Sequence, residues 1–218
     1  MTSVHPELTE ADALVAAIKL ADSPGRSLLG VTGAPGAGKS AYAEQLVDAV
    51  NHAGRSAVLV PMDGFHLAHS ALVSLGLADI KGAPETFDAA GYLDLLRRIR
   101  EPGEETVWAP RFDRSIEDAI AASIPIQPTV DLVVTEGNYL LLPQGQWWLV
   151  RLQLDECWFI ELDDEERRRR LQARHEQYGR SSDEAAERTL GSDEANAVLV
   201  SRTRDEADAI IRPAARVR

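Results

Sequence analysis

The sequence predicts an α/β protein in which helices cover both faces of a central parallel β-sheet. Short apolar runs that read as strands alternate along the chain with longer segments of helical periodicity. These runs are apolar at nearly every position, which is typical of strands that are buried on both faces. The 218 residues suit one domain, and no internal repeat or Gly/Ser linker divides them.

The first part of the chain contains two helices and two strands in this pattern. Apolar residues recur every three or four positions from Leu8 to Leu20, which predicts an amphipathic helix. The run from Leu28 to Val31 reads as a buried strand and ends in glycines. A second helix is expected from Ala41 to Ala53, closed by Gly54, and the apolar residues 56–61 predict the next strand.

The rest of the chain is expected to add further helices around two or three more strands. Residues 67–100 read as two helical pieces separated by KGAPETFD, whose Gly82 and Pro84 require a turn or loop. Residues 110–114 are expected to lie in a loop. The remaining elements are strands at 131–135 and 156–162, helices at 163–174 and 183–208, and a short last strand at 209–212.

Composition and charge exclude several classes of protein. The formal net charge of −12 argues against a general nucleic-acid binder, whose affinity rests on neutralising phosphates. No run of 18 apolar residues predicts a membrane span, and acids stand near the start where a signal peptide carries basic residues. The single cysteine, Cys157, cannot form an internal disulfide. We therefore expect a cytoplasmic protein without nucleic-acid or membrane partners, with a homodimer as the default assembly.

The strongest functional signal is the segment GAPGAGKS at residues 33–40. It matches the phosphate-binding P-loop pattern GxxxxGK[ST] in full and lies between a predicted strand and a predicted helix. Glycines let backbone N–H groups surround a phosphate, and the helix N-terminus adds partial positive charge. Lys39 is expected to reach the β- and γ-phosphates of a nucleotide, and Ser40 to ligate Mg²⁺. The predicted nucleotide contacts are Gly33, Ala34, Pro35, Gly36, Ala37, Gly38, Lys39, Ser40 and Ala41.

Two acids, Asp63 and Glu136, lie at the ends of predicted strands, and a glycine follows each. In α/β sheets of this kind, ligands bind at the carboxyl ends of the strands. In phosphoryl transfer, one acid can accept the proton of the attacking hydroxyl and another can hold Mg²⁺ or its waters. Asp63 is thus the candidate catalytic base, and Glu136 a candidate metal and substrate contact. The alternative for each is a turn-stabilising role before glycine.

Five motifs resemble one group of P-loop kinases when they are taken in order: GAPGAGKS, PMDGFH, KGAPETFD, TEGNYLLL and TRDEADAIIR. This set spans roughly residues 28–212 and is similar to the uridine kinase, phosphoribulokinase and bacterial pantothenate kinase group, especially its pantothenate kinase branch and fructokinase-like members. The resemblance implies a three-layer P-loop NTPase fold with a helical lid. It also implies a kinase that uses ATP and Mg²⁺ to phosphorylate the hydroxyl of a small molecule.

The resemblance further implies roles for single residues. Asp63 corresponds to the catalytic base, Asp88 to a carboxylate that holds substrate hydroxyls, and Asn196 lies near substrate-contacting asparagines of pantothenate kinases. Residues 167–174 resemble a lid whose arginines close over the triphosphate, although a solvated helix face is the alternative. The candidate lid arginines are Arg167 and Arg170, in catalytic roles, and Arg174, in nucleotide binding.

Two departures from the family pattern leave the acceptor open. No histidine follows residues 110–114 as it does in uridine kinases, and His66 stands where those kinases have an aromatic residue. The later substrate segments of pantothenate kinases have no convincing match. His66, Arg111 and Asp113 are candidate acceptor contacts, and either Arg111 or Arg114 can grip an anionic group.

The sequence thus predicts an ATP-dependent small-molecule kinase. Its acceptor is expected to be the hydroxyl of a sugar, polyol, nucleoside or pantothenate-like metabolite. A nucleoside monophosphate kinase and a regulatory ATPase without a small acceptor are the alternatives. Residues 1–218 are expected to form a single kinase domain with an acceptor-binding insertion at about 64–118 and a lid at about 164–182.

Overall fold

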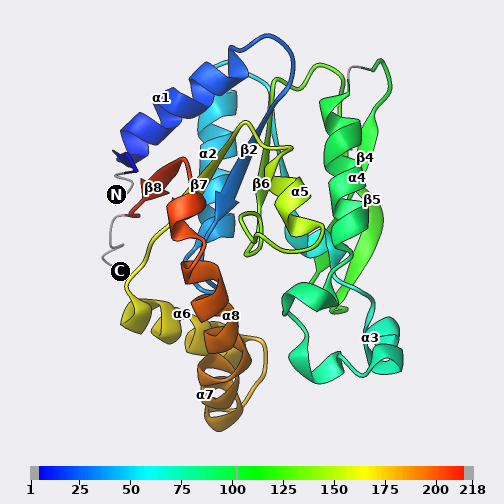
Figure 1. The fold of residues 1–218 in the computed structure, drawn as a ribbon, viewed down its shortest axis with the longest axis vertical. Coiled ribbons are helices and arrows are strands. Elements are labelled where there is room, and N and C mark those ends of the chain that lie inside the picture. The colour runs from blue at the N-terminus through cyan, green and yellow to red at the C-terminus, as the bar shows by residue number, and fades with distance from the viewer. Residues whose placement is uncertain (1–4, 102, 214–218) are drawn as a thin grey trace.

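A computed structural model describes residues 5–101 and 103–213 and has a six-stranded parallel β-sheet at its centre (Figure 1). The strands are β1 (Glu7–Leu8), β2 (Ser27–Thr32), β3 (Ala57–Pro61), β6 (Leu132–Glu136), β7 (Glu156–Ile160) and β8 (Ala209–Ile211). Their order is β1-β8-β7-β2-β6-β3, and every neighbouring pair is parallel. The predicted α/β class is confirmed. Only β1 was absent from the prediction, because two residues carry no periodic signal.

Helices cover both faces of the sheet because successive side chains of a strand point to opposite faces. In β2, Leu29 and Val31 pack with α1 (Glu10–Ala21) and α2 (Lys39–His52). Leu28 instead belongs to a second cluster, formed with α4 (Ala89–Arg100), α5 (Trp147–Arg151) and the end of α8 (Ser192–Ser201). The result is a three-layer α/β fold with the sheet in the middle.

The chain between β3 and β6 contains the largest difference from the prediction. It includes a 3₁₀ turn (Met62–Phe65), α3 (His69–Leu75), two more 3₁₀ turns, α4 and an antiparallel hairpin of β4 (Val107–Asp113) and β5 (Asp118–Ile126). The predicted loop at residues 110–114 is wrong, because Arg111, Phe112 and Asp113 pair with β5. An irregularity between Ala109 and Arg111 interrupts the strand pattern around the proline, which explains why the sequence reads as a loop.

Three helices follow β7: α6 (Asp164–Gln177), α7 (Ser182–Leu190) and α8. Asp163 caps α6, and Ser181 caps α7 through a capping box with Glu184. The predicted helix at 183–208 is divided at Gly191 and ends in a 3₁₀ turn. Figure 1 shows α6, α7 and α8 on one side of the lower end of the sheet and α3 on the other. No helix in the described part of the chain has the length and apolar character to cross a bilayer.

Candidate active site

The P-loop connects β2 to α2 and lines one part of the site. Gly33, Gly36 and Gly38 have φ values of 148°, 82° and 93°. A Cβ atom on Gly33 would lie 2.6 Å from the carbonyl oxygen of Ile160, and one on Gly36 would lie 2.9 Å from that of Arg167. Both the backbone conformation and the available space therefore require glycine here. This geometry places the loop at the N-terminus of α2, where helices favour anions.

Lys39 is the first residue of α2, and only 8% of its surface is exposed. Its Nζ atom donates a hydrogen bond to the carbonyl oxygen of Ala34 at 3.1 Å. Burial lowers the pKa of Lys39 to about 8, although the carboxylates of Glu136 and Asp63 oppose the shift. The site therefore contains a poorly solvated ammonium group, which the phosphates of a nucleotide would stabilise.

Ser40 and Glu136 meet directly beside this lysine. The Ser40 hydroxyl donates to Oε1 of Glu136 at 3.0 Å, and Glu136 is 5% exposed at the end of β6. Burial, with a contribution from Asp63, raises the pKa of Glu136 above its usual range. No cluster of three His, Cys, Asp or Glu side chains that could hold a metal exists among the described residues. The hydroxyl and the carboxylate nevertheless fit Mg²⁺, which commonly takes one or two protein ligands together with phosphate oxygens and waters.

Asp63 follows β3, which is the strand beside β6 in the sheet. Its carboxylate is paired with the Arg114 guanidinium at 3.3 Å, and its carbonyl oxygen lies 2.9 Å from Nδ1 of His66. Because β2, β6 and β3 are adjacent and parallel, the P-loop, Glu136 and Asp63 all lie at the same end of the sheet.

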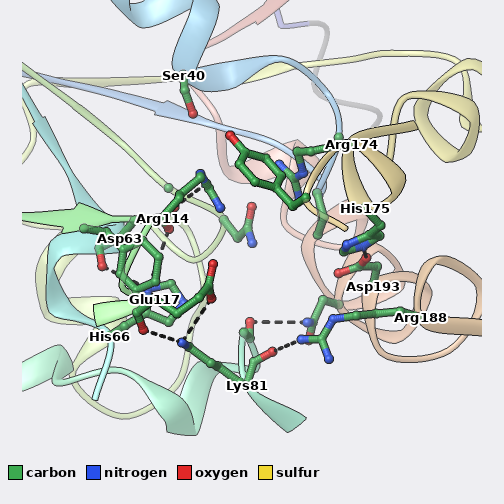
Figure 2. Close-up of a pocket in the computed structure, with 18 of the residues that line it drawn as sticks. Ser40, Asp63, His66, Lys81, Arg114, Glu117, Arg174, His175, Arg188 and Asp193 are labelled. Atoms are coloured by element: carbon green, nitrogen blue, oxygen red, sulfur yellow. Dashed lines mark hydrogen bonds and ion pairs between the residues drawn. The ribbon is translucent and has the colours of Figure 1, made fainter. Parts of the chain in front are cut away.

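These groups line one cavity of about 690 Å³. Figure 2 shows Ser40 on one side of it, with Asp63 and Arg114 facing inward from the insertion and Arg174 and His175 from α6. His66 packs against the rings of Phe87 and Phe112, with centroid separations of 4.0 and 4.9 Å. The cavity therefore has a charged end at the P-loop and an aromatic surface beside Asp63.

A family model described as "Phosphoribulokinase / Uridine kinase family" matches residues 28–217. The chain belongs to this family. It is 30% identical over 215 residues to the Schizosaccharomyces pombe protein named "Putative uridine kinase C227.14", a match that covers 94% of this chain and 92% of that one. The Escherichia coli protein named "Uncharacterized protein YggC" is 33% identical over 175 residues, covering 79% of this chain and 70% of that one.

A solved structure from Silicibacter sp. TM1040, described as a "putative fructose transport system kinase", superposes with a TM-score of 0.82 and is 35% identical, covering 90% of this chain and 98% of that one. The family resemblance inferred from the motifs is confirmed. The protein is thus a P-loop small-molecule kinase of the phosphoribulokinase/uridine kinase family, a family that uses ATP.

The structure places the three candidate lid arginines of this kinase in different surroundings. Arg167 is 1% exposed, and its guanidinium pairs with Asp164 and Glu194 at 3.0 and 2.6 Å. It lines a smaller cavity of about 230 Å³ beside Ala34 and Ala37 of the P-loop, and it is not among the residues that line the larger one.

The other two lid arginines differ in whether they line the larger cavity. The Nη1 atom of Arg170 lies 3.6 Å from the position of a Cβ atom on Gly38, and its Nε bonds to Glu166 at 2.7 Å. Arg174 lines the larger cavity. It is partly open to solvent, and the loss of hydration in the cavity, together with neighbouring Arg114, lowers its pKa.

The candidate acceptor contacts also fall into two groups, those that line the larger cavity and those that do not. His66 and Asn196 line the larger cavity with Asp63 and Glu136, whereas Asp88, Arg111 and Asp113 do not. Asp88 accepts a hydrogen bond from the Gly91 backbone at 2.8 Å and so begins α4, and Asp113 bonds to Ser115 in the hairpin turn. The predicted substrate roles of these residues are untested, and the geometry gives Asp88 a capping role.

Several residues in the cavity were not singled out from the sequence, among them Lys81, Glu117 and Arg188. His175 also lines the cavity, with its Nε2 atom 2.7 Å from Asp193. These residues come from segments far apart in the chain, so no local spacing reveals them. The one available signal was Lys81, a rare lysine at the start of the KGAPETFD motif.

Proposed function

We propose that this kinase transfers the γ-phosphoryl group of ATP to a hydroxyl of a small metabolite with the help of Mg²⁺. The observation that carries the proposal is one cavity lined by a P-loop lysine, a serine–carboxylate pair and a separate carboxylate, Asp63. A hydroxyl that attacks the γ-phosphorus needs such a base, whereas the attacking phosphate oxygen of a nucleoside monophosphate is already ionised and would be repelled by a carboxylate at that position.

In this mechanism Asp63 receives the proton of the acceptor hydroxyl. The hydroxyl oxygen forms a bond to the γ-phosphorus while the bond from that phosphorus to the β,γ-bridging oxygen breaks, and ADP leaves. Lys39 and the P-loop N–H groups stabilise the charge on the phosphate oxygens. Ser40 and Glu136 would hold Mg²⁺, which neutralises phosphate charge when it is bound.

We assign one closing arginine to Arg174, and Arg170 stays a predicted one, because its Nη1 atom lies beside Gly38 of the P-loop although its Nε is paired with Glu166. Arg174 lines the cavity, and no carboxylate of the described residues forms an ion pair with it. An arginine without an acidic partner is available for phosphate oxygens, which suit its planar fork. Arg167 is instead fully engaged by Asp164 and Glu194, and we assign it to holding α6 against α8 and the P-loop.

The test begins with a coupled assay of ADP release over sugars, polyols, nucleosides and pantothenate, followed by mass analysis of the product. With the accepted substrate, Asp63→Asn is expected to lower kcat about 10²- to 10⁴-fold, because proton acceptance is lost. Binding of an ATP analogue should stay within about twofold, since the P-loop is intact. Asp94→Asn, on an exposed face of α4, is the matched control.

Two results would contradict the proposal. Undiminished turnover in folded Asp63→Asn would remove the base from the mechanism. ATP hydrolysis without phosphorylation of any acceptor in the panel would favour the regulatory ATPase.

A further inference from the structure

The cavity concentrates positive charge in a strongly acidic chain. The protein has 23 lysines and arginines against 35 acids, for a formal charge of −12. Of the described residues that line the cavity, six are basic and five are acidic. The basic residues are Lys39, Lys81, Arg114, Arg174, Arg180 and Arg188. This local excess selects for anionic ligands, and the position of each basic residue decides which ligand it serves.

Lys81 and Arg188 lie at the end of the cavity away from the P-loop. In Figure 2 both are on the opposite side of the cavity from Ser40, and the Arg188 side chain reaches the Lys81 backbone. Nη2 of Arg188 donates to the carbonyl oxygen of Lys81 at 2.7 Å. This contact joins α7 to the loop before α4, and the rest of the guanidinium fork has no other hydrogen-bond partner among the described residues.

The Lys81 ammonium is held at the same end by two contacts with Glu117. Its Nζ atom bonds to the Glu117 carbonyl oxygen at 2.7 Å and to Oε2 of Glu117 at 3.3 Å. The Glu117 side chain is 62% exposed, so this ion pair contributes little free energy. Lys81 also lies 5.1 Å from the centre of the Phe112 ring, on the aromatic surface that leads toward Asp63.

The other polar side chains at this end make contacts of their own. Asp193 is paired with His175 at 2.7 Å. Glu184 is engaged in the capping box of α7, where it bonds to Ser181 at 3.0 Å. Asn196 donates to the Gly82 carbonyl oxygen at 3.3 Å and supports the same loop. Arg188 therefore has hydrogen-bonding capacity left for a ligand, and an anion can replace the exposed Glu117 carboxylate on Lys81.

We propose that the acceptor carries a carboxylate or phosphate group, and that this anionic group binds between Lys81 and Arg188 while the acceptor hydroxyl faces Asp63. The proposal rests on the proposed kinase function and narrows its substrates to hydroxy acids or phosphorylated polyols. The carbon skeleton between the two groups would pack along His66 and Phe112. Arginine binds both kinds of anion through its planar fork, and lysine adds a point charge.

The test compares matched acceptors that differ only in their charged group. Glycerol, glycerate and glycerol 3-phosphate form one set, and ribose, ribonate and ribose 5-phosphate form another. In a coupled assay with product mass analysis, kcat/KM is expected to be at least about 100-fold higher for an anionic member of a set than for its neutral member. Which anion is preferred tells a carboxylate site from a phosphate site.

A variant of Arg188 then tests whether this residue causes the preference for anionic acceptors. Arg188→Met is expected to reduce the anionic-to-neutral ratio of kcat/KM about 10- to 100-fold, mainly through the KM of the acceptor. Arg188→Lys, which keeps the charge but loses the fork, should restore part of the ratio. Arg202→Met, an exposed arginine at the end of α8, should leave the ratio unchanged.

A direct binding experiment separates this inference from the kinase proposal. Calorimetric titration of each acceptor uses protein saturated with Mg²⁺ and a non-hydrolysable ATP analogue, so that the P-loop is occupied. Anion binding that disappears in Arg188→Met, without turnover, would support the anion site and contradict the kinase. Turnover that favours neutral acceptors would overturn the anion site and leave the kinase standing. The absence of both binding and turnover for every acceptor, anionic or neutral, would overturn both.

Discussion

At the P-loop end of the cavity, the polar groups are buried and come from neighbouring strand ends, whereas at the far end they are more exposed and come from distant segments. Lys39 and Glu136 are both less than one-tenth exposed and are positioned by β2, β6 and α2. Lys81 and Arg188 are 107 positions apart in the chain and are joined by a side-chain-to-backbone contact. In the proposed function the first end stabilises a phosphate, and the second end binds the acceptor.

This difference predicts the largest effect at the buried end. Lys39→Met should lower kcat/KM about 1000-fold or more, because a preorganised charge on the transferring phosphate is lost in a poorly solvated site. Lys19→Met, an exposed lysine on α1, is the matched control. Steady-state kinetics with circular dichroism would check activity and fold, and a loss smaller than tenfold would mean that Lys39 is not a principal phosphate contact.

A smaller effect is expected from Arg114, which pairs with Asp63 at 3.3 Å and lies 5.9 Å from the ring centres of both Phe112 and Tyr178. Arg114→Met should lower kcat/KM for the acceptor about tenfold, because the base loses the side chain that orients it. The KM for ATP should change less than twofold. Arg98→Met, on the exposed side of α4, is the control. An equal rise in both KM values would contradict the assignment of Arg114 to the acceptor end.

An effect of similar size, reached only at high pH, concerns the affinity for nucleotide. Because burial lowers the pKa of Lys39 to about 8, the free protein loses this proton above that pH, and nucleotide binding must then restore it. Affinity for an ATP analogue should therefore fall as pH rises above about 8, reaching about a tenfold loss near pH 9. Lys39→Arg should flatten the profile, since arginine stays charged. Calorimetry across pH 7–9.5 would measure the affinity profiles of the wild type and of Lys39→Arg. A flat profile for the wild type would contradict the lowered pKa of Lys39.

The same lowered pKa gives a definite sign for stability. Between about pH 8 and the ordinary value of 10.5, the unfolded chain binds the Lys39 proton and the folded chain does not. The contribution of this group to the free energy of unfolding therefore rises with pH across that window. Below about pH 8 the buried ammonium lowers the free energy of unfolding. In the proposed function this loss of stability accompanies a positive charge that contacts phosphate.

Much of the fold was predictable because its signals are local. Five of the six sheet strands follow from continuous apolar runs, and α1, α2, α4 and α6 follow from apolar periodicity or a charged run with a capping residue. The β4–β5 hairpin was missed because Pro110 and an irregular register interrupt the strand pattern of β4. The two strands form by pairing with each other, and this pairing cannot be read from either segment alone. Helix α5 was missed because five residues are too few to show a period.

In the candidate active site, too, some residues have local signals in the sequence and others do not. The amino-acid sequence alone determined the P-loop and the acids Asp63 and Glu136, because glycines, a lysine and strand-end carboxylates have meaning within a few positions of the chain. Only the tertiary structure decided that Arg174 faces the cavity while Arg167 is held by Asp164 and Glu194, and that Lys81 meets Arg188. The reason is physical: the burial and charge partners of a side chain depend on which segments pack around it, and those segments are distant in the sequence.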